Sequence, residues 1–229
     1  MIRNGVIFRI EYEKNIRGVI FDIDGVLLDS LSIWSDLAGR YLRSQEKEPE
    51  PGLYEIIFSM SMEESAAYMS EHYGLGLSPE DVVIGLEDML RDFYYNEVEA
   101  KPGALELMRF FEKKDLVMVA ATSSPRDHVE HALKRTGQLS YLSGIFTNAE
   151  VGSSKSSPQI YDTAAEYMGI EPGEIIVFED SLYALKTAAG AGYHTVGVFD
   201  EKGEPDQEGM KENAEIYIKS MEDFPESFL

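Results

Sequence analysis

The chain has 229 residues, a formal net charge of −22 and no cysteine. The lack of cysteine excludes disulfides, thiolate zinc sites and cysteine nucleophiles. The negative charge repels nucleic acid and anionic membranes, so we expect neither as a partner. No apolar run approaches the roughly 20 residues of a membrane span, and the first residues lack a signal-peptide pattern. We therefore expect a cytoplasmic protein.

The first two predicted elements are strands. Residues 6–12 alternate apolar and polar side chains, which predicts a half-exposed strand without an evident role. Residues 17–22 include the apolar run Val-Ile-Phe, which favours a strand buried on both faces. Asp22 and Asp24 follow this run, and Gly25 permits a sharp turn. Buried acids need partners, so the pair favours a metal or substrate site, although solvated aspartates are the simpler interpretation of this pair alone.

Residues 31 to about 97 are predicted to be helical throughout. Apolar residues recur at helical spacing after Ser30, namely Leu31, Trp34, Ala38, Tyr41 and Leu42. We expect Trp34 in the core of this first helix. Prolines and charges at 46–52 predict a loop. The run Ser-Pro-Glu-Asp at 78–81 predicts a later helix start, with a capping hydroxyl and a proline in the first turn.

From residue 103 onward, helices and strands alternate. Helices are predicted at 104–114, from 125 to about 136, at 158–168 and at 181–189, and strands at 116–121, 145–147, 175–178, 195–198 and 216–218. This alternation predicts an α/β fold with a Rossmann-like, doubly wound parallel sheet. We expect residues 1–30 and 103–229 to form the core domain and residues 31–102 to form an inserted helical domain.

Further polar residues follow the predicted strands. Thr122 and Ser123 end one strand, Glu179 and Asp180 end another, and Lys155 lies in a Gly-Ser-Ser-Lys-Ser-Ser loop before a helix. Taken singly, these residues are helix caps or a solvated lysine. The carboxyl ends of parallel strands meet at one edge of a sheet, where such folds bind ligands. The sequence therefore predicts one site that combines carboxylates, hydroxyls and an ammonium.

These motifs resemble those of the haloacid dehalogenase superfamily of phosphohydrolases. Residues 21–30, Phe-Asp-Ile-Asp-Gly-Val-Leu-Leu-Asp-Ser, match the first family motif, and residues 121–124, Lys155 and residues 177–181 resemble the second, third and fourth. The helical insertion resembles the four-helix cap of the subgroup with β-phosphoglucomutase and phosphoglycolate phosphatase. Two positions depart from the family pattern: Ser156 stands where proline is usual, and Ala184 where glycine is frequent.

The resemblance implies distinct roles for the two aspartates. Asp22 would attack phosphorus and form an aspartyl-phosphate, and Asp24 would act as general acid and then as general base. Mg²⁺ would be held by Asp22, the main-chain carbonyl of Asp24 and Asp180, with Glu179 as a ligand or as the partner of one. All-oxygen ligation suits this ion.

The other motifs would bind the transferring phosphoryl group. Thr122 and the main-chain amides around Ser123 would hold it at a helix N-terminus, and Lys155 would neutralise developing charge. The expected activity is hydrolysis of a small phosphomonoester by a monomer or weak homodimer. The acid at Asp24 argues against a dehalogenase, since dehalogenases of the superfamily lack an acid there.

Two alternatives remain open at this point. A sugar-phosphate mutase would need a basic group in the cap for a second phosphate, and between residues 44 and 90 the basic residues are Lys47 and His72. A non-catalytic protein that binds a phosphorylated metabolite would use the same pocket. Substrate choice is expected to depend on cap segments within 44–62, with residues 60–63 facing the core domain.

Overall fold

The computed structural model describes residues 2–3, 6–8, 15–58 and 60–229. The chain divides into two compact units, the first formed by Met1–Ser30 with Val98–Leu229 and the second by Leu31–Glu97. The expected insertion extended to residue 102, whereas residues 98–102 belong to the first unit. Residues 98–102 belong there because their backbone pairs with the loop after β3 (Gly18–Phe21). The Asp29 N–H donates to the Glu99 carbonyl, and the Lys101 N–H donates to the Leu27 carbonyl.

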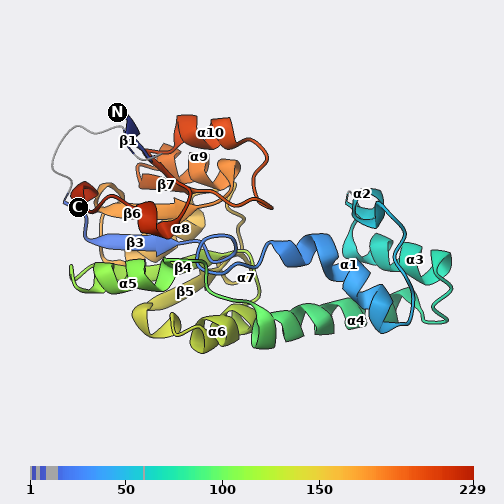
Figure 1. The fold of residues 1–229 in the computed structure, drawn as a ribbon. Coiled ribbons are helices and arrows are strands. Elements are labelled where there is room, and N and C mark those ends of the chain that lie inside the picture. Colours follow the sequence, from blue (N-terminus) through green and yellow to red (C-terminus); the bar gives the residue numbers. More distant parts are fainter. Residues whose placement is uncertain (1, 4–5, 9–14, 59) are drawn as a thin grey trace. The chain divides into compact units, whose positions relative to one another are not determined.

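The first unit is built on one sheet with the strand order β1-β2-β8-β7-β6-β3-β4-β5 (Figure 1). The strands are β1 (Ile2–Arg3), β2 (Val6–Phe8), β3 (Gly18–Phe21), β4 (Val117–Thr122), β5 (Gly144–Thr147), β6 (Ile175–Glu179), β7 (His194–Val198) and β8 (Ile216–Ile218). Neighbours from β8 to β5 pair in parallel. The predicted parallel sheet is therefore confirmed.

An antiparallel pair extends the sheet at one edge. β2 pairs with β8, and β1 pairs with β2. The strand expected at 6–12 corresponds to β2 at its first three positions, and residues 9–12 lie outside the described part of the chain.

The strand order reverses beside β3. From β3 the chain proceeds outward through β4 to β5, returns to β6 on the other side of β3, and proceeds through β7 to β8. Such a switch point opens a crevice at the carboxyl ends of the two central strands. β3 and β6 are aligned so that Phe21 lies beside Phe178, which brings the residues after them to the same edge.

Helices cover both faces of this sheet. They are α5 (Ala104–Glu112), α6 (Arg126–Arg135), α7 (Asn148–Val151), α8 (Gln159–Met168), α9 (Leu182–Gly190) and α10 (Gln207–Asn213). Short 3₁₀ turns are η2 (Leu139–Tyr141), η3 (Pro172–Glu174), η4 (Met221–Asp223) and η5 (Glu226–Phe228). None of the described helices is long and apolar enough to cross a membrane.

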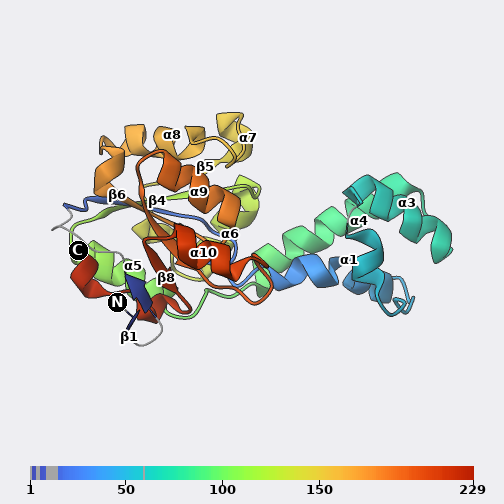
Figure 2. The same cartoon turned by 90° about the horizontal axis from the view of Figure 1, so that it is seen from above.

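The buried core lies on the two faces of the central strands. Ile20 and Val177 belong to a buried cluster with residues of α8. Phe21 and Phe178 point to the other face, where their rings lie 6.1 and 6.0 Å from the ring of Phe111 on α5. Figure 2 shows α8 and α5 on opposite sides of the strands. Burial on both faces explains why the central strands are continuous apolar runs.

The second unit is helical, as the sequence predicts. Its described helices are α1 (Ser32–Ser44), α2 (Leu53–Ile57), α3 (Met62–His72), α4 (Pro79–Asp92) and a π-helical turn, η1 (Phe93–Glu97). The predicted start of α4 is confirmed, because the Ser78 hydroxyl accepts the Asp81 N–H and the Asp81 carboxylate accepts the Ser78 N–H. Reciprocal bonds of this kind satisfy two otherwise unpaired amides.

The expected burial of Trp34 is wrong. The buried stripe of α1 runs through Ile33, Leu37 and Tyr41, so Trp34 lies at its edge and is 46% exposed. Trp34 instead lines a cavity of about 290 Å³ within the second unit. Most other side chains around this cavity are apolar, including Leu37, Tyr54, Ile57, Met62 and Leu86.

Candidate active site

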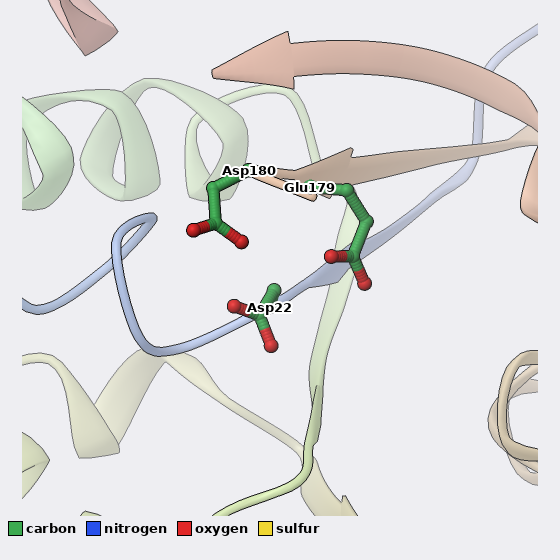
Figure 3. A group of neighbouring side chains, drawn as sticks. All are labelled: Asp22, Glu179 and Asp180. Carbon is green, nitrogen blue, oxygen red and sulfur yellow. The ribbon is translucent and has the colours of Figure 1, made fainter. Parts of the chain in front are cut away.

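Three carboxylates converge at the switch point of the sheet. Asp22 follows β3 directly, Glu179 is the last residue of β6, and Asp180 comes next. One oxygen from each lies within 4.8 Å of the others. Figure 3 shows the three side chains pointing toward one another from the two adjacent strands. The convergence expected from the sequence is therefore present for these residues.

Lys155 joins the cluster although it lies in a loop far along the chain. Its ammonium contacts Asp22 Oδ1 and donates to Glu179 Oε1 at 2.7 Å, and its side chain is 3% exposed. Burial acts to lower the pKa of Lys155, but the carboxylates of Asp22 and Glu179 outweigh it and raise that pKa above its ordinary value. The ammonium is thus a fixed charge beside Asp22.

One ammonium does not balance the acids around it. Burial raises the pKa of Asp22 well above its ordinary value, and Lys155 opposes that shift only in part. Burial, reinforced by Glu179, raises the pKa of Asp180 to about 7. Both shifts mean that the ionised forms are unfavourable here without further positive charge.

The donor set fits a magnesium ion. Asp22, Glu179 and Asp180 offer only carboxylate oxygens, which hard cations prefer. Glu179 Oε2 is buried and has no hydrogen-bond partner among the described residues. A divalent cation would supply both the missing positive charge and a partner for such an oxygen. The Asp24 side chain is not part of this cluster, and the resemblance assigns only its main-chain carbonyl to the ion.

Asp24 is held separately by two hydroxyls. Ser30 donates to its Oδ1 and Ser124 donates to its Oδ2, each at 2.6 Å. Ser30 lies in the first motif and Ser124 in the second, so this carboxylate joins the loops after β3 and β4. Neither serine has an expected role from the sequence. Short polar side chains in turns are usually explained by local capping, which is why this long-range contact gave no signal.

The end of β4 and the loop after it place the Thr122 hydroxyl and the Ser123 main-chain amide, which are expected to bind phosphate. Thr122 is fully buried, and its Oγ1 accepts the N–H of Ser124 at 3.0 Å. That bond does not use the hydroxyl hydrogen of Thr122, which can still be donated. The Ser123 hydroxyl accepts a hydrogen bond from Asn148 Nδ2 at 2.7 Å. Asn148 begins α7 after β5 and was not singled out from the sequence.

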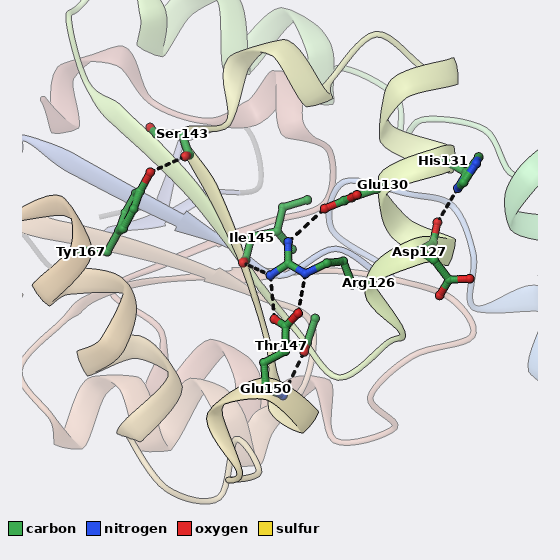
Figure 4. Close-up of polar contacts among 9 residues, drawn as sticks. All are labelled: Arg126, Asp127, Glu130, His131, Ser143, Ile145, Thr147, Glu150 and Tyr167. Atoms are coloured by element: carbon green, nitrogen blue, oxygen red, sulfur yellow. Dashed lines mark hydrogen bonds and ion pairs between the residues drawn. The ribbon is translucent and has the colours of Figure 1, made fainter.

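Arg126 fastens this loop to the next one (Figure 4). Its guanidinium donates to both oxygens of Glu150, at 2.5 and 2.6 Å, and to the Ile145 carbonyl at 2.6 Å. A further bond reaches Glu130 on the same helix at 2.9 Å. Glu150 lies on α7, shortly before Lys155. The bidentate pair therefore connects the start of α6 with the segment that carries the lysine.

Tyr161, which lies outside the four sequence motifs, completes the buried network. Tyr161 on α8 donates its hydroxyl to Glu179 Oε1 at 2.7 Å. Burial, reinforced by Glu179, raises the pKa of Tyr161 above its ordinary value, so the hydroxyl keeps its proton. A signal did exist, because a tyrosine on the apolar face of a buried helix needs a partner for its hydroxyl.

The fold and the site define an α/β protein with a carboxylate-rich site at the switch point of a parallel sheet. The model of the haloacid dehalogenase-like hydrolases matches residues 16–192. The chain belongs to this family of hydrolases, as the four motifs suggested.

Individual relatives agree with this family. The chain is 25% identical to a phosphorylated carbohydrates phosphatase of Thermotoga maritima, with 79% of this chain and 84% of that protein covered. It is 29% identical to a Drosophila melanogaster protein provisionally named pseudouridine-5′-phosphatase, with 94% of each covered. A Thermotoga maritima crystal structure provisionally named β-phosphoglucomutase superposes with a TM-score of 0.81 at 25% identity, covering 90% of this chain and 96% of that one.

Proposed function

We propose that the protein is a phosphatase that hydrolyses the phosphomonoester of a small metabolite through a phosphorylated Asp22. The observation that carries this proposal is the buried contact between Asp22 and Lys155 at the switch point. An ammonium in this position keeps a carboxylate oxygen oriented and offsets the negative charge of an approaching phosphate. Phosphatase relatives over most of the chain support the same chemistry.

The reaction proceeds in two displacements at phosphorus. A carboxylate oxygen of Asp22 forms a bond to phosphorus while the ester oxygen leaves with a proton from Asp24. Water then attacks phosphorus and gives its proton to Asp24. The bond between phosphorus and the Asp22 oxygen breaks, so that inorganic phosphate is released and the Asp22 carboxylate is restored. Ser30 and Ser124 hold the Asp24 carboxylate in place for both proton transfers. Thr122, the amides around Ser123 and Lys155 bind the phosphoryl oxygens.

Magnesium is the proposed cofactor. Asp22, Asp180 and the Asp24 carbonyl would hold it, with Glu179 as a ligand or as the partner of a ligand water. When bound, the ion supplies positive charge to phosphate oxygens in a site where acids outnumber the lysine. The cytoplasmic location and the monomeric or weakly dimeric state stay predictions.

The charges of the second unit favour a phosphatase over a mutase. Arg40 and Arg43 pair with Asp36, Arg91 pairs with Asp88, and His72 contacts Glu50. These cations already have acidic partners, so few remain to bind a second phosphate. We therefore propose a substrate with a single phosphate, and the names of the relatives support a sugar phosphate or a nucleoside monophosphate.

We further propose that the second unit acts as a cap that selects the substrate. Its apolar cavity, lined by Trp34 and Tyr54, offers a surface for the part of a substrate that carries no charge. Specificity that resides in an inserted unit leaves the chemistry of the sheet edge unchanged. The expectation that residues 60–63 face the core remains a prediction.

The test is hydrolysis of p-nitrophenyl phosphate with Mg²⁺ and with a chelator. We expect Mg²⁺-dependent release of phosphate that falls by at least about 10³-fold in Asp22→Asn. Asp29→Asn is the matched control, because Asp29 lies in the same loop but is exposed. Wild-type rates in Asp22→Asn, with contaminating phosphatase removed, would refute the proposal.

A substrate panel separates the remaining alternatives. Sugar phosphates, nucleoside monophosphates, phosphoglycolate and polyol phosphates are tested for phosphate release. Conversion of β-glucose 1-phosphate to the 6-phosphate without net phosphate release would identify a mutase. Binding of phosphate without turnover of any panel member would identify a non-catalytic binding protein.

A further inference from the structure

The hydrogen bonds of Glu179 are distributed unevenly between its two oxygens. Oε1 accepts from both Lys155 and Tyr161, each at 2.7 Å. Oε2 accepts from none of the described residues, although Glu179 is only 1% exposed. A buried carboxylate oxygen without a donor is costly. The arrangement therefore points to a ligand at Oε2.

Packing of the ring does not account for the hydroxyl of Tyr161. Its ring belongs to the buried cluster on one face of the sheet, where a phenylalanine would fill nearly the same volume. Burying a hydroxyl costs free energy unless it finds a partner. Here the partner is a charged group of the candidate site rather than a main-chain carbonyl nearby.

Tyr193 provides an internal comparison. It belongs to the same cluster, and its hydroxyl donates at 2.8 Å to Asp162, an exposed carboxylate on α8. Both tyrosines thus bury a ring in one cluster and donate to a carboxylate. They differ in that only Tyr161 reaches an acid of the candidate site.

We propose that Tyr161 is a positioning residue for the metal ion. The Tyr161 hydroxyl and the Lys155 ammonium both donate to Oε1 of Glu179. Oε2 is thereby oriented to bind a divalent cation, either directly or through a water molecule. This inference rests on the proposed function of the site. Tyr161 acts only through Glu179 and touches neither the substrate nor the reacting atoms.

The physical reason lies in the freedom of a carboxylate with one donor. Lys155 is shared between Asp22 and Glu179 and carries rotatable donors on a flexible chain. Without the tyrosine hydroxyl, the carboxylate plane of Glu179 can rotate so that both oxygens face that ammonium. Two donors on one oxygen hold the plane, which leaves the other oxygen available to the ion before the ion arrives. Mutation of a residue that hydrogen-bonds to a metal ligand typically weakens metal affinity by about 10–100-fold.

The experiment measures Mg²⁺ binding to the whole protein without substrate, by calorimetric titration. We expect Tyr161→Phe to raise the Mg²⁺ dissociation constant about tenfold, and Tyr193→Phe to leave it within about twofold of wild type. With p-nitrophenyl phosphate, the Mg²⁺ concentration for half-maximal rate should rise in parallel in Tyr161→Phe. Its kcat at saturating Mg²⁺ and its KM for substrate should stay within about threefold of wild type, because the tyrosine acts on metal binding alone.

A double-mutant cycle tests whether Tyr161 acts through Glu179. In a Glu179→Gln background, Tyr161→Phe should cause no further loss of Mg²⁺ affinity, since the acceptor is already altered. Additive losses would overturn the proposal, as would unchanged Mg²⁺ binding in Tyr161→Phe or equal losses in the two tyrosine variants. A Tyr161→Phe protein that fails to fold would also overturn it, because the hydroxyl would then serve the core.

These outcomes are distinct from failure of the proposed function. A wild-type protein that neither binds Mg²⁺ nor releases phosphate from any panel substrate contradicts the phosphatase itself. A wild-type protein that does both, together with an unaffected Tyr161→Phe variant, contradicts only the role of Tyr161.

Discussion

The charged residues at the sheet edge of the first unit and those of the helical unit differ in burial. At the edge of the sheet, Asp22, Lys155 and Glu179 are almost fully buried, and the lysine contacts both acids. In the helical unit, ion pairs such as Arg43 with Asp36 are about half exposed and the cavity is mostly apolar. Exposed pairs contribute little free energy, whereas buried charges are costly to hold unless they are paired or serve a function. The comparison agrees with the proposal that the first unit carries the chemistry and the second selects the substrate.

The largest expected effect concerns proton transfer by Asp24. Asp24→Asn should lower the steady-state rate on alkyl phosphates by about 10²–10⁴-fold, because an alkoxide leaves poorly without a proton. p-Nitrophenolate needs no proton, so the variant should still release a burst of it and accumulate phosphorylated enzyme. Rapid-mixing kinetics with both substrates measure the difference. Equal losses on the two substrates, without a burst, would contradict the role of Asp24 as the acid.

The second effect is the stabilisation of the folded protein by Mg²⁺, which should depend on acids at the sheet edge and not on acids of the helical unit. Mg²⁺ at 100 times its dissociation constant should raise the free energy of unfolding by about 2.7 kcal/mol. Asp180→Asn should remove most of this gain, since a proposed ligand is lost. Asp88→Asn, which changes an exposed acid of the helical unit, should retain it. Urea unfolding with Mg²⁺ or chelator measures these values. If both variants lost the Mg²⁺-dependent gain equally, the proposed difference between the two units would be wrong.

A smaller effect is expected from the cavity of the helical unit. Trp34→Ala should raise KM about three- to tenfold for substrates whose uncharged part occupies the cavity, through lost apolar contact. The kcat for p-nitrophenyl phosphate should stay within about twofold, because the sheet edge is unchanged. Steady-state kinetics over the substrate panel measure both. A large loss of kcat on every substrate would assign a catalytic role to the helical unit.

The smallest effect concerns the ion pair between Arg126 and Glu150, which connects the segments after β4 and β5. Arg126 lowers the pKa of Glu150 from its ordinary value of 4.5 to about 2. A lowered pKa means that the stabilisation is complete above pH 4.5 and is lost as the pH falls toward 2. Both side chains are more than one-third exposed, so Arg126→Gln should cost only about 1 kcal/mol at pH 7.

The pH dependence distinguishes this pair from ordinary surface pairs. The difference in unfolding free energy between wild type and Arg126→Gln should shrink between pH 5 and pH 3. Arg91→Gln, which breaks an exposed pair on α4, should cost less than about 0.5 kcal/mol at either pH. A difference for Arg126→Gln that does not change with pH would show that the arginine acts through packing or through the Ile145 carbonyl.

Elements with a clear apolar pattern were predictable from the sequence. β3 and β6 are apolar runs buried on both faces, and their order along the chain limits the sheet to few topologies. Two short helices were not predictable: α7 has four residues, and α10 contains Met210 as its main apolar side chain. Trp34 was misplaced because neighbouring positions on a helix differ by about 100°, so an apolar stripe read from the sequence can shift by one residue.

The candidate site was predictable where residues follow strands. Asp22, Thr122, Glu179 and Asp180 owe their positions to strand ends, and parallel pairing gathers those ends at one edge. Ser124 and Tyr161 contact residues far away in the chain, and such contacts depend on loop paths and helix packing that local patterns do not encode. The sequence therefore supplies the reacting groups, and the structure supplies the groups that hold them.

The most direct test of the account is to trap the phosphorylated enzyme. Wild type and Asp24→Asn are mixed with p-nitrophenyl phosphate and Mg²⁺, quenched within the burst and reduced with borohydride, which converts an aspartyl-phosphate to homoserine. Peptide mass mapping should then find homoserine at position 22, dependent on both substrate and Mg²⁺ and more abundant in Asp24→Asn. Turnover without any modification of Asp22, or with modification of another residue, would contradict the account.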